Sequence, residues 1–149
     1  MEVVKIIQWD MGHRVMNHRS ICKGLHGHRY KAEISIKGEL IDIDGASEEG
    51  MVVDFADIKK IANSFIQEKL DHAFMVWEKD TELLDFFKKS KGHKPVIVPF
   101  TSTAENVAAY IFNELDGQFN DAFGTGLRLH SVKLWETPTS CAIFGVEDK

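Results

Sequence analysis

Hydrophobic and polar residues follow two different periods along this chain, one typical of strands and one typical of amphipathic helices. From Tyr30 to Ile36, apolar and polar side chains alternate, which predicts a half-buried strand over residues 26–38. Three further strands are predicted over residues 2–9, 127–136 and 140–147. The last two lie on either side of Thr137-Pro138-Thr139, which predicts a hairpin.

Apolar residues three or four positions apart predict two long helices. The first begins after Asp54, a residue type favoured as an N-cap, and ends near Leu70-Asp71-His72. Its apolar stripe is a predicted core face and consists of Ile58, Ile61, Ala62, Phe65, Ile66 and Leu70. The second helix begins at Ser102 or Thr103, and its apolar face consists of Val107, Ala108, Ile111, Phe112 and Leu115.

The remaining segments predict shorter elements and connections. Residues 80–91 predict a short helix with Thr81 as its cap, and residues 95–100 predict an extended run between two prolines. The acidic, turn-rich residues 42–50 predict an exposed connection. The main elements therefore follow the order β-β-α-α-β-β, an α+β fold with two long helices on one face of an antiparallel sheet. We expect residues 1–149 to form a single domain, because their number suits one hydrophobic core.

Composition narrows the classes of protein that this chain could be. Hydrophobic residues make up 44% and charged residues 28%, as in ordinary globular proteins. The net charge of -5 argues against nucleic-acid and anionic-membrane binding, and no apolar run approaches the roughly 20 residues of a membrane span. Two cysteines make no disulfide framework, and the first residues carry no signal-peptide core. We therefore expect a cytoplasmic protein.

Cys22-Lys23-Gly24-Leu25-His26-Gly27-His28 places a thiol and two imidazoles within seven residues. On a strand, His26 and His28 point to one face, and His13 could supply a third nitrogen. Three histidines with an open position are typical of catalytic zinc, whereas Cys22 as a fourth ligand would close a structural site. Histidines packed in the core or lying at the surface are the alternative to both.

The same region is strongly basic. Between His13 and Ala32 there is no acidic residue. Its five cationic side chains are Arg14, Arg19, Lys23, Arg29 and Lys31. A basic segment beside a metal suggests an anionic ligand such as a phosphate, although a solvated loop explains the charges equally well.

Two acidic residues are further candidates for chemistry. Asp71 adjoins His72 at a helix end, where the pair could exchange protons if the backbone there is not helical, and is otherwise an exposed terminus. Glu136, at a strand end beside Trp135, is either a rim residue or a carboxylate that accepts two parallel N–H groups of a heterocycle. Three further candidates for lining a pocket, each of which also has a capping or core interpretation, are Thr103, Glu105 and Phe55.

Six separated motifs together resemble the 6-pyruvoyl-tetrahydropterin synthase family over essentially the whole chain. They are Cys22-x-x-x-His26-Gly27-His28, His13-Arg14, Gly50-Met51-Val52-Val53-Asp54-Phe55, Leu70-Asp71-His72, Thr103-Ala104-Glu105-Asn106 and Trp135-Glu136-Thr137. The three-residue gap between Cys22 and His26 is similar to the bacterial branch, the 6-carboxy-5,6,7,8-tetrahydropterin synthases of 7-deazaguanine (queuosine-type) biosynthesis. The resemblance implies a tunnelling fold (T-fold), which assembles as a homo-oligomer, commonly a hexamer of two trimers, with active sites between subunits.

The resemblance also implies roles for individual residues. Zn²⁺ would be held by His13, His26 and His28, and protons would be transferred by Cys22, Asp71 and His72. Glu136 would anchor the pterin ring, with Thr103, Glu105 and Phe55 nearby. The implied reaction converts 7,8-dihydroneopterin triphosphate into 6-carboxy-5,6,7,8-tetrahydropterin, acetaldehyde and triphosphate.

Departures from the family pattern leave two alternatives open. Thr101-Ser102-Thr103 lacks the proline often found before that threonine, Met11-Gly12 replaces the usual small pair before the first histidine, and residues 78–100 look long. The product could therefore be the 6-pyruvoyl compound, although the short gap after Cys22 argues against it. A non-catalytic scaffold, with Cys22 closing the zinc site, is the alternative from another class. We expect ordinary core or surface roles for His18, His93 and His130.

Overall fold

The computed structural model describes residues 1–149, apart from the side chain of Thr125, and its centre is one six-stranded sheet in the order β4-β3-β1-β2-β5-β6. The strands are β1 (Glu2–His13), β2 (His26–Lys37), β3 (Ala73–Trp77), β4 (Pro95–Val98), β5 (Arg128–Thr137) and β6 (Ser140–Gly145). The helices are α1 (Phe55–Phe65), α2 (Thr81–Lys89) and α3 (Ala104–Phe123).

The sheet is mixed rather than wholly antiparallel. β1, β2, β5 and β6 pair antiparallel, as predicted, and β5 and β6 form the predicted hairpin. β3 pairs parallel with β1, and β4 pairs parallel with β3. β3 was not predicted, and the expectation of a purely antiparallel sheet was wrong. A parallel pair needs a crossover connection, which the segment containing α1 supplies before β3 and α2 supplies before β4.

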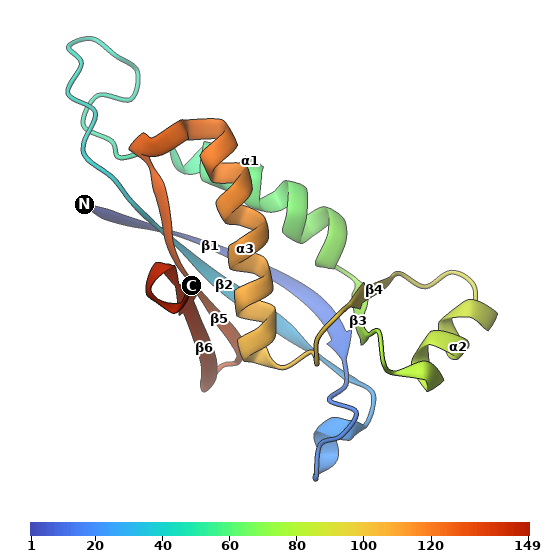
Figure 1. Ribbon diagram of the computed structural model, residues 1–149. Helices are drawn as coiled ribbons and strands as arrows, with labels where there is room; N and C mark the ends of the chain where they lie inside the picture. Colours follow the sequence, from blue (N-terminus) through green and yellow to red (C-terminus); the bar gives the residue numbers. More distant parts are fainter.

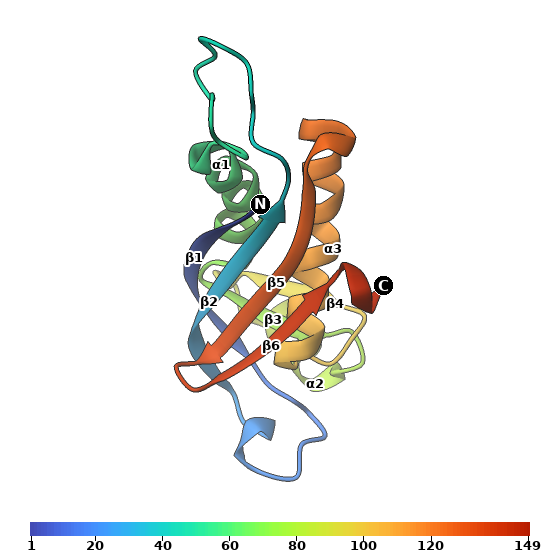
Figure 2. The ribbon, with the colours of Figure 1, turned by 90° about the vertical axis from the view of Figure 1, so that its left-hand side faces the viewer.

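The two long helices, α1 and α3, cover one face of the sheet, as predicted (Figure 1). Viewed from the side, β1, β2, β5 and β6 lie in front of both helices (Figure 2). The core lies between these layers, because alternate residues of the strands point towards the helices and are buried. On β2 these buried residues are Tyr30, Ala32, Ile34 and Ile36. Every predicted stripe residue of the helices is buried except Ile61, which is partly buried against the core.

The helix ends follow their capping side chains. The Asp54 carboxylate accepts a hydrogen bond of 2.7 Å from Ala56 N, and Thr103 caps α3. α1 widens into a π-helical turn, Ile66–Leu70, and therefore ends where the sequence predicts. The cap of α2 is Asp80 and not Thr81, because the Asp80 carboxylate accepts from Leu83 N at 3.2 Å.

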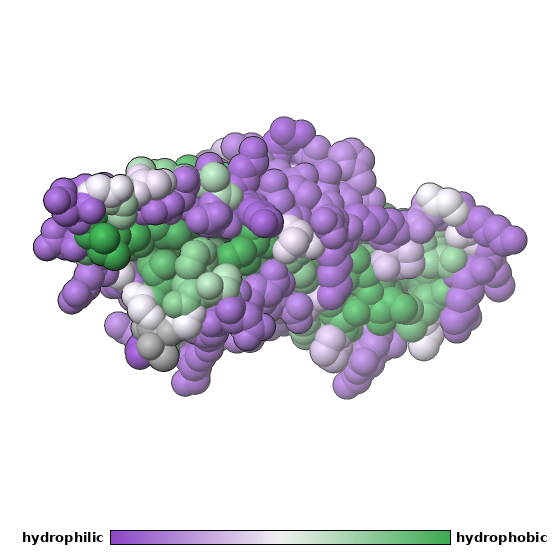
Figure 3. Space-filling view, turned by 90° about the horizontal axis from the view of Figure 1, so that it is seen from above, coloured by the Kyte–Doolittle hydropathy of each residue, from purple (hydrophilic) through white to green (hydrophobic). Residues whose placement is uncertain are grey.

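Two connections project from opposite ends of the layers, residues 14–25 and residues 38–54 (Figures 1 and 2). The surface seen from above is largely hydrophilic, with apolar areas over the end that carries α2 and over the opposite end (Figure 3). Phe86 and Ile97, near α2, are among the exposed large hydrophobic residues. Among the described residues, no helix has the length and hydrophobicity needed to cross a membrane.

Candidate metal site between the first two strands

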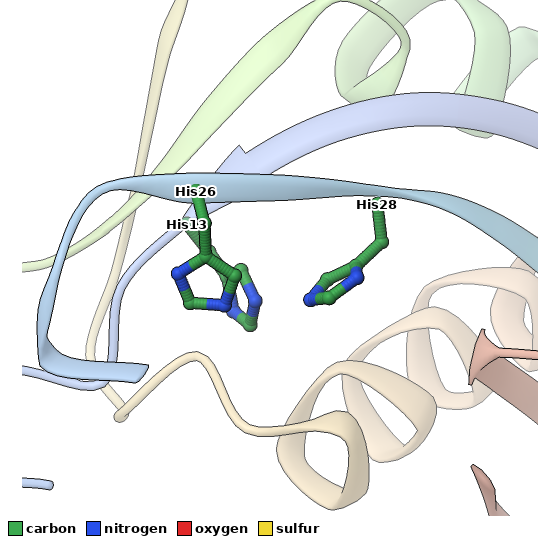
Figure 4. Close-up of side chains that lie close together, drawn as sticks. All are labelled: His13, His26 and His28. Carbon is green, nitrogen blue, oxygen red and sulfur yellow. The ribbon is translucent and has the colours of Figure 1, made fainter. Parts of the chain in front are cut away.

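The register of β1 and β2 brings three histidines to the end of the sheet. His13 is the last residue of β1 and lies directly opposite His26, the first residue of β2. His28 lies two residues further along β2 and therefore points to the same face as His26. All three rings point into one space, towards the start of α3 (Figure 4).

The spacing of the rings suits one metal ion. One ring nitrogen from each histidine lies within 4.8 Å of the other two, and no other residue belongs to this ligand group in the described part of the chain. Tetrahedral zinc with bonds of about 2.0–2.1 Å to nitrogen separates its ligand atoms by about 3.3 Å. Small rotations of the imidazoles therefore suffice to enclose an ion.

Backbone carbonyls select the tautomer of two of the rings. Nδ1 of His13 lies 2.6 Å from Ser102 O, and Nδ1 of His26 lies 2.9 Å from Gly24 O. A carbonyl only accepts hydrogen bonds, so each Nδ1 carries the proton and each Nε2 keeps its lone pair for a metal. His13 Nε2 is buried and has no hydrogen-bond partner among the described residues, which is an arrangement that a metal ion would satisfy.

Burial also favours the neutral, ligating form of the imidazoles. It lowers the pKa of His13, against the opposing effect of the hydrogen bond with Ser102 O. It lowers the pKa of His28 as well, where the charge of Glu136 opposes it. Both rings are therefore held closer to the state that binds a metal.

Glu136 lies at the edge of the histidine cluster. Its Oε1 atom is 3.5 Å from His13 Nε2 and 4.0 Å from His28 Nε2. Tyr30, fully buried beneath the rings, is edge-on to His13 and His28. Burial, followed by the charge of Glu136, raises the pKa of Tyr30, so its hydroxyl stays protonated. A carboxylate thus faces the place where a metal and its ligand would meet.

A hollow of about 330 Å³ opens beside the cluster and collects most of the predicted site residues. Cys22, Thr103, Glu105 and Glu136 line it together with His13 and His26. Three lining residues that sequence reasoning missed are His18, Ser140 and Cys141. The pairing of β5 with β6 brings Ser140 and Cys141 to the hollow, and the path of residues 14–25 brings His18 there. No hydrophobic period in the sequence indicates either arrangement. A larger hollow, about 570 Å³, is lined by His28 and Glu136, whereas another, about 560 Å³ between α1 and α3, contains none of the predicted site residues.

Asp71 and His72 lie on the other side of the sheet. His72 has a left-handed backbone (φ 56°), and its Nδ1 is 3.0 Å from Asp71 Oδ2, so this segment is non-helical and the two side chains meet. His72 lines a separate hollow, mainly with residues such as Asp10, Gly12 and Arg29, which alternate along their strands with the inward-facing residues; the inward-facing Met11 and His28 also reach its lining. The His72 side chain is 80% exposed. Within one chain, the acid–histidine pair is therefore separated from Cys22.

The backbone of β1 holds this pair. Asp10 N donates to Asp71 Oδ1 at 3.1 Å, and His72 N donates to Asp10 O at 2.8 Å. Burial raises the pKa of Asp71, but the hydrogen bond from Asp10 and the neighbouring His72 outweigh it and lower that pKa overall. The carboxylate is thereby kept ionised beside the imidazole.

Phe55 is not part of the hollow beside the histidines. It is 49% exposed at the start of α1, and the nearest charged group recorded over its ring is Lys5 Nζ at 5.9 Å. Lys5 lies eight residues before His13 on β1, a separation of about 27 Å at the usual rise of a strand. The interpretation of Phe55 as a lining residue therefore has no support within one chain.

The basic segment is divided by ion pairs. Arg14 binds Asp80 and Glu82, and Arg29 binds Asp10. Lys31 Nζ lies 3.2 Å from Glu33 Oε1 and also lies over the ring of Trp135. Arg19 and Lys23 form no ion pair with the described residues. These two loop residues, close in sequence to Cys22, are thus the cations that remain available to an anionic ligand.

The fold and the site define an α+β protein with a three-histidine cluster at the end of its sheet. A family model described as 6-pyruvoyl tetrahydropterin synthase matches residues 2–147. The chain belongs to the 6-pyruvoyl tetrahydropterin synthase family. This membership supports an enzyme of the lyase class that acts on pterins.

Individual relatives agree with this assignment. The chain is 35% identical over 142 residues to a 6-carboxy-5,6,7,8-tetrahydropterin synthase of Haemophilus influenzae, covering 93% of this chain and 94% of that one. It is 30% identical over 165 residues to the protein of the same name from Aquifex aeolicus, covering 98% of both. Among solved structures, 6-pyruvoyl tetrahydropterin synthase from Caenorhabditis elegans superposes with a TM-score of 0.66 at 26% identity, covering 97% of this chain and 94% of that one. The uncharacterized protein WS1659 from Wolinella succinogenes superposes with a TM-score of 0.79 at 26% identity, covering 98% of both chains.

Proposed function

We propose that this chain is a zinc-dependent lyase that converts 7,8-dihydroneopterin triphosphate and water into 6-carboxy-5,6,7,8-tetrahydropterin, acetaldehyde and triphosphate. The observation that carries the proposal is the three-histidine cluster, which opens into a hollow lined by two thiols, one of them Cys22, and two carboxylates. The names of relatives at 30–36% identity supply the substrate class. We place the reaction in cytoplasmic 7-deazaguanine (queuosine-type) biosynthesis, carried out by one T-fold domain over residues 1–149.

His13, His26 and His28 would hold the zinc ion through Nε2 or the equivalent free nitrogen, because the donor set and the unpartnered His13 Nε2 suit it. When bound, Zn²⁺ supplies Lewis-acid polarisation of the hydroxyl groups on the substrate side chain. Cys22, which lines the same hollow but does not belong to the ligand group, remains available as a base for a carbon-bound proton. This division of roles favours an open catalytic site over a closed Cys-His₃ site.

The remaining residues of the hollow would bind and orient the substrate. Glu136 would accept hydrogen bonds from the N–H groups of the pterin ring, and Thr103 and Glu105 would contact the ring from the first turn of α3. Phe55 stays in this proposal only as a contribution from another copy of the chain. Arg19 and Lys23 are the residues that we assign to the triphosphate.

The acid–histidine pair would reach the hollow from a second copy of the chain. Asp71 and His72 face away from the hollow of their own chain, and the His72 ring is exposed. We therefore propose a homo-oligomer, a hexamer of two trimers, whose active sites lie between subunits. In it, His72 would return or relay protons, with Asp71 orienting the imidazole.

One assay tests the reaction and its main alternative. The purified, zinc-loaded protein is incubated with 7,8-dihydroneopterin triphosphate, and the products are identified by mass spectrometry. We expect the 6-carboxy product together with acetaldehyde. The 6-pyruvoyl compound as the sole product would replace our proposal with the other activity of the family, and unchanged substrate would refute both.

A Cys22→Ala variant separates the enzyme from a zinc-stabilised scaffold. We expect zinc content and oligomeric state to survive while turnover is lost, because the thiol acts on substrate and not on the metal. Cys141→Ala is the matched control for zinc content, since Cys141 is the other cysteine and lines the same hollow without belonging to the ligand group. Loss of stoichiometric zinc from Cys22→Ala alone would favour the scaffold.

A further inference from the structure

Arg14, the residue after the metal-site histidine His13, is held by a two-pronged ion pair. Its Nε donates to Asp80 Oδ2 and its Nη2 donates to Asp80 Oδ1, each at 2.6 Å. The side chains are 13% and 2% exposed, so water screens the pair little. Such a fork fixes the guanidinium in direction as well as position. Glu82 also contacts Arg14 Nη2, at 2.8 Å, but its side chain is 81% exposed.

Asp80 is itself held firmly by the fold. Its carboxylate caps α2 by accepting from Leu83 N, and its backbone N donates to Trp77 O at 2.9 Å. Asp80 therefore ends the turn after β3 through its backbone, and its carboxylate both caps α2 and binds Arg14. The segment that looked long in the sequence, residues 78–100, thus provides a fixed support for the end of β1.

Ser102 provides a second attachment for Arg14 and also contacts His13. Ser102 Oγ donates to Arg14 O at 3.0 Å, and Ser102 O accepts from His13 Nδ1 at 2.6 Å. Ser102 is fully buried and directly precedes Thr103, the cap of α3, which lines the hollow. Asp80 therefore holds the Arg14 side chain, while Ser102 holds the Arg14 backbone and the His13 ring.

We propose that Asp80 is a positioning residue for the metal site, acting through Arg14 to hold the His13 imidazole and the start of α3 in one arrangement. Asp80 does not line the hollow itself. Its effect is indirect. Without the ion pair to Asp80, the Arg14 side chain is free to move, and the backbone that carries the hydrogen bonds of His13 and Arg14 with Ser102 is held less rigidly. The inference rests on the zinc-dependent function proposed above. It assigns α2 and its cap a part in that function.

The test compares Asp80→Asn with the control Glu82→Gln. Asparagine keeps the shape and the capping oxygen of Asp80 but removes the charge and one prong of the fork. Glu82→Gln alters the exposed contact of the same guanidinium. Zinc affinity is measured by competition with a chromogenic chelator, at a temperature well below unfolding. We expect Asp80→Asn to bind zinc about 10-fold more weakly, the lower end of the cost of losing a direct hydrogen-bond partner of a ligand, because Asp80 acts through Arg14, and Glu82→Gln to stay within about threefold of the native chain.

Two further measurements separate positioning from general stability. The visible spectrum of the Co²⁺-substituted protein reports the arrangement of the ligands, and we expect it to change in Asp80→Asn and not in Glu82→Gln. Arg14→Lys, which keeps the charge and loses the fork, serves if Asp80→Asn does not fold, and we expect it to lose zinc affinity in the same direction. Native zinc affinity and a native cobalt spectrum in the folded variant would overturn the inference.

This test stands apart from the test of the reaction. Zinc and cobalt binding are measured without substrate, so an absence of pterin turnover in the native chain would refute the proposed function and leave the affinity ratio measurable. Conversely, full turnover and full affinity in Asp80→Asn would refute the positioning role and leave the proposed function intact.

Discussion

Mixing two inactive variants tests whether the catalytic residues come from different copies of the chain. Cys22→Ala removes the thiol from the hollow beside the histidines, and His72→Ala removes the imidazole from the opposite face of the sheet. If each site combines Cys22 of one chain with His72 of another, an oligomer that contains both variants rebuilds some intact sites. Neither variant alone can do so.

The expected recovery follows from the geometry. In a random one-to-one mixture, the chain that supplies the hollow carries Cys22 in half of the cases, and its neighbour carries His72 in half of the cases. About one quarter of the sites are then intact, whatever the number of subunits in the closed ring. If both residues instead served the same chain, the mixture would have no intact site.

The assay is product formation by co-expressed variants carrying different purification tags, with mixed oligomers verified by native mass spectrometry. The control mixes Cys22→Ala with the Cys22→Ala/His72→Ala double variant, which contains no Cys22 and should stay inactive. Zinc content must match that of the native protein in all samples. Verified mixed oligomers without activity above the parent variants would refute the shared site.

Three further predictions concern stability. Phe112→Ala, which truncates a fully buried side chain of α3 packed against Phe144, should lower the free energy of unfolding by about 3–5 kcal/mol in urea titrations. Tyr30→Phe removes a buried hydroxyl that lies near the Glu136 carboxylate without the geometry of a full hydrogen bond, so stability should rise by about 1 kcal/mol, and a loss of that size would reveal a hydrogen bond to Glu136. The hydrogen bonds from Arg14 lower the pKa of Asp80 below its ordinary 3.8. The stabilisation from these hydrogen bonds is therefore complete above pH 3.8 and is lost as the pH falls below that value. Between pH 6 and pH 2, the melting temperature of Asp80→Asn should therefore decrease less than that of the native chain.

Long periodic segments explain why much of the fold was predictable. The stripe on α1 and the alternation on β2 each extend over many residues, so the faces that they bury were clear. The histidine cluster followed from the same period, because His26 and His28 are two residues apart on a strand. The position of His13 opposite His26 needed the register of β1, which a sequence alone does not state.

Short or doubly buried elements explain what was missed. β3 is only five residues, Ala-Phe-Met-Val-Trp, and all five are apolar, so no alternation of polar and apolar residues marks it as a strand. The cap of α2 was misplaced by one residue because Asp80 and Thr81 are both favourable cap residues, and only the contact with Leu83 N decides between them. The fork between Arg14 and Asp80 joins residues 66 positions apart, and no local pattern indicates it.

The alternation of β1 also explains why one chain is insufficient for the proposed chemistry. His13 points towards the helices, whereas the backbone of Asp10, on the side of β3, holds Asp71 and His72. A shift of one residue would exchange the faces of β1, but it would also bury polar residues in place of Ile7, Trp9 and Met11. No small movement therefore unites His72 with Cys22 inside a chain. A second copy of the chain can bring its His72 close to Cys22 without changing either sheet, because the His72 ring is exposed at the surface.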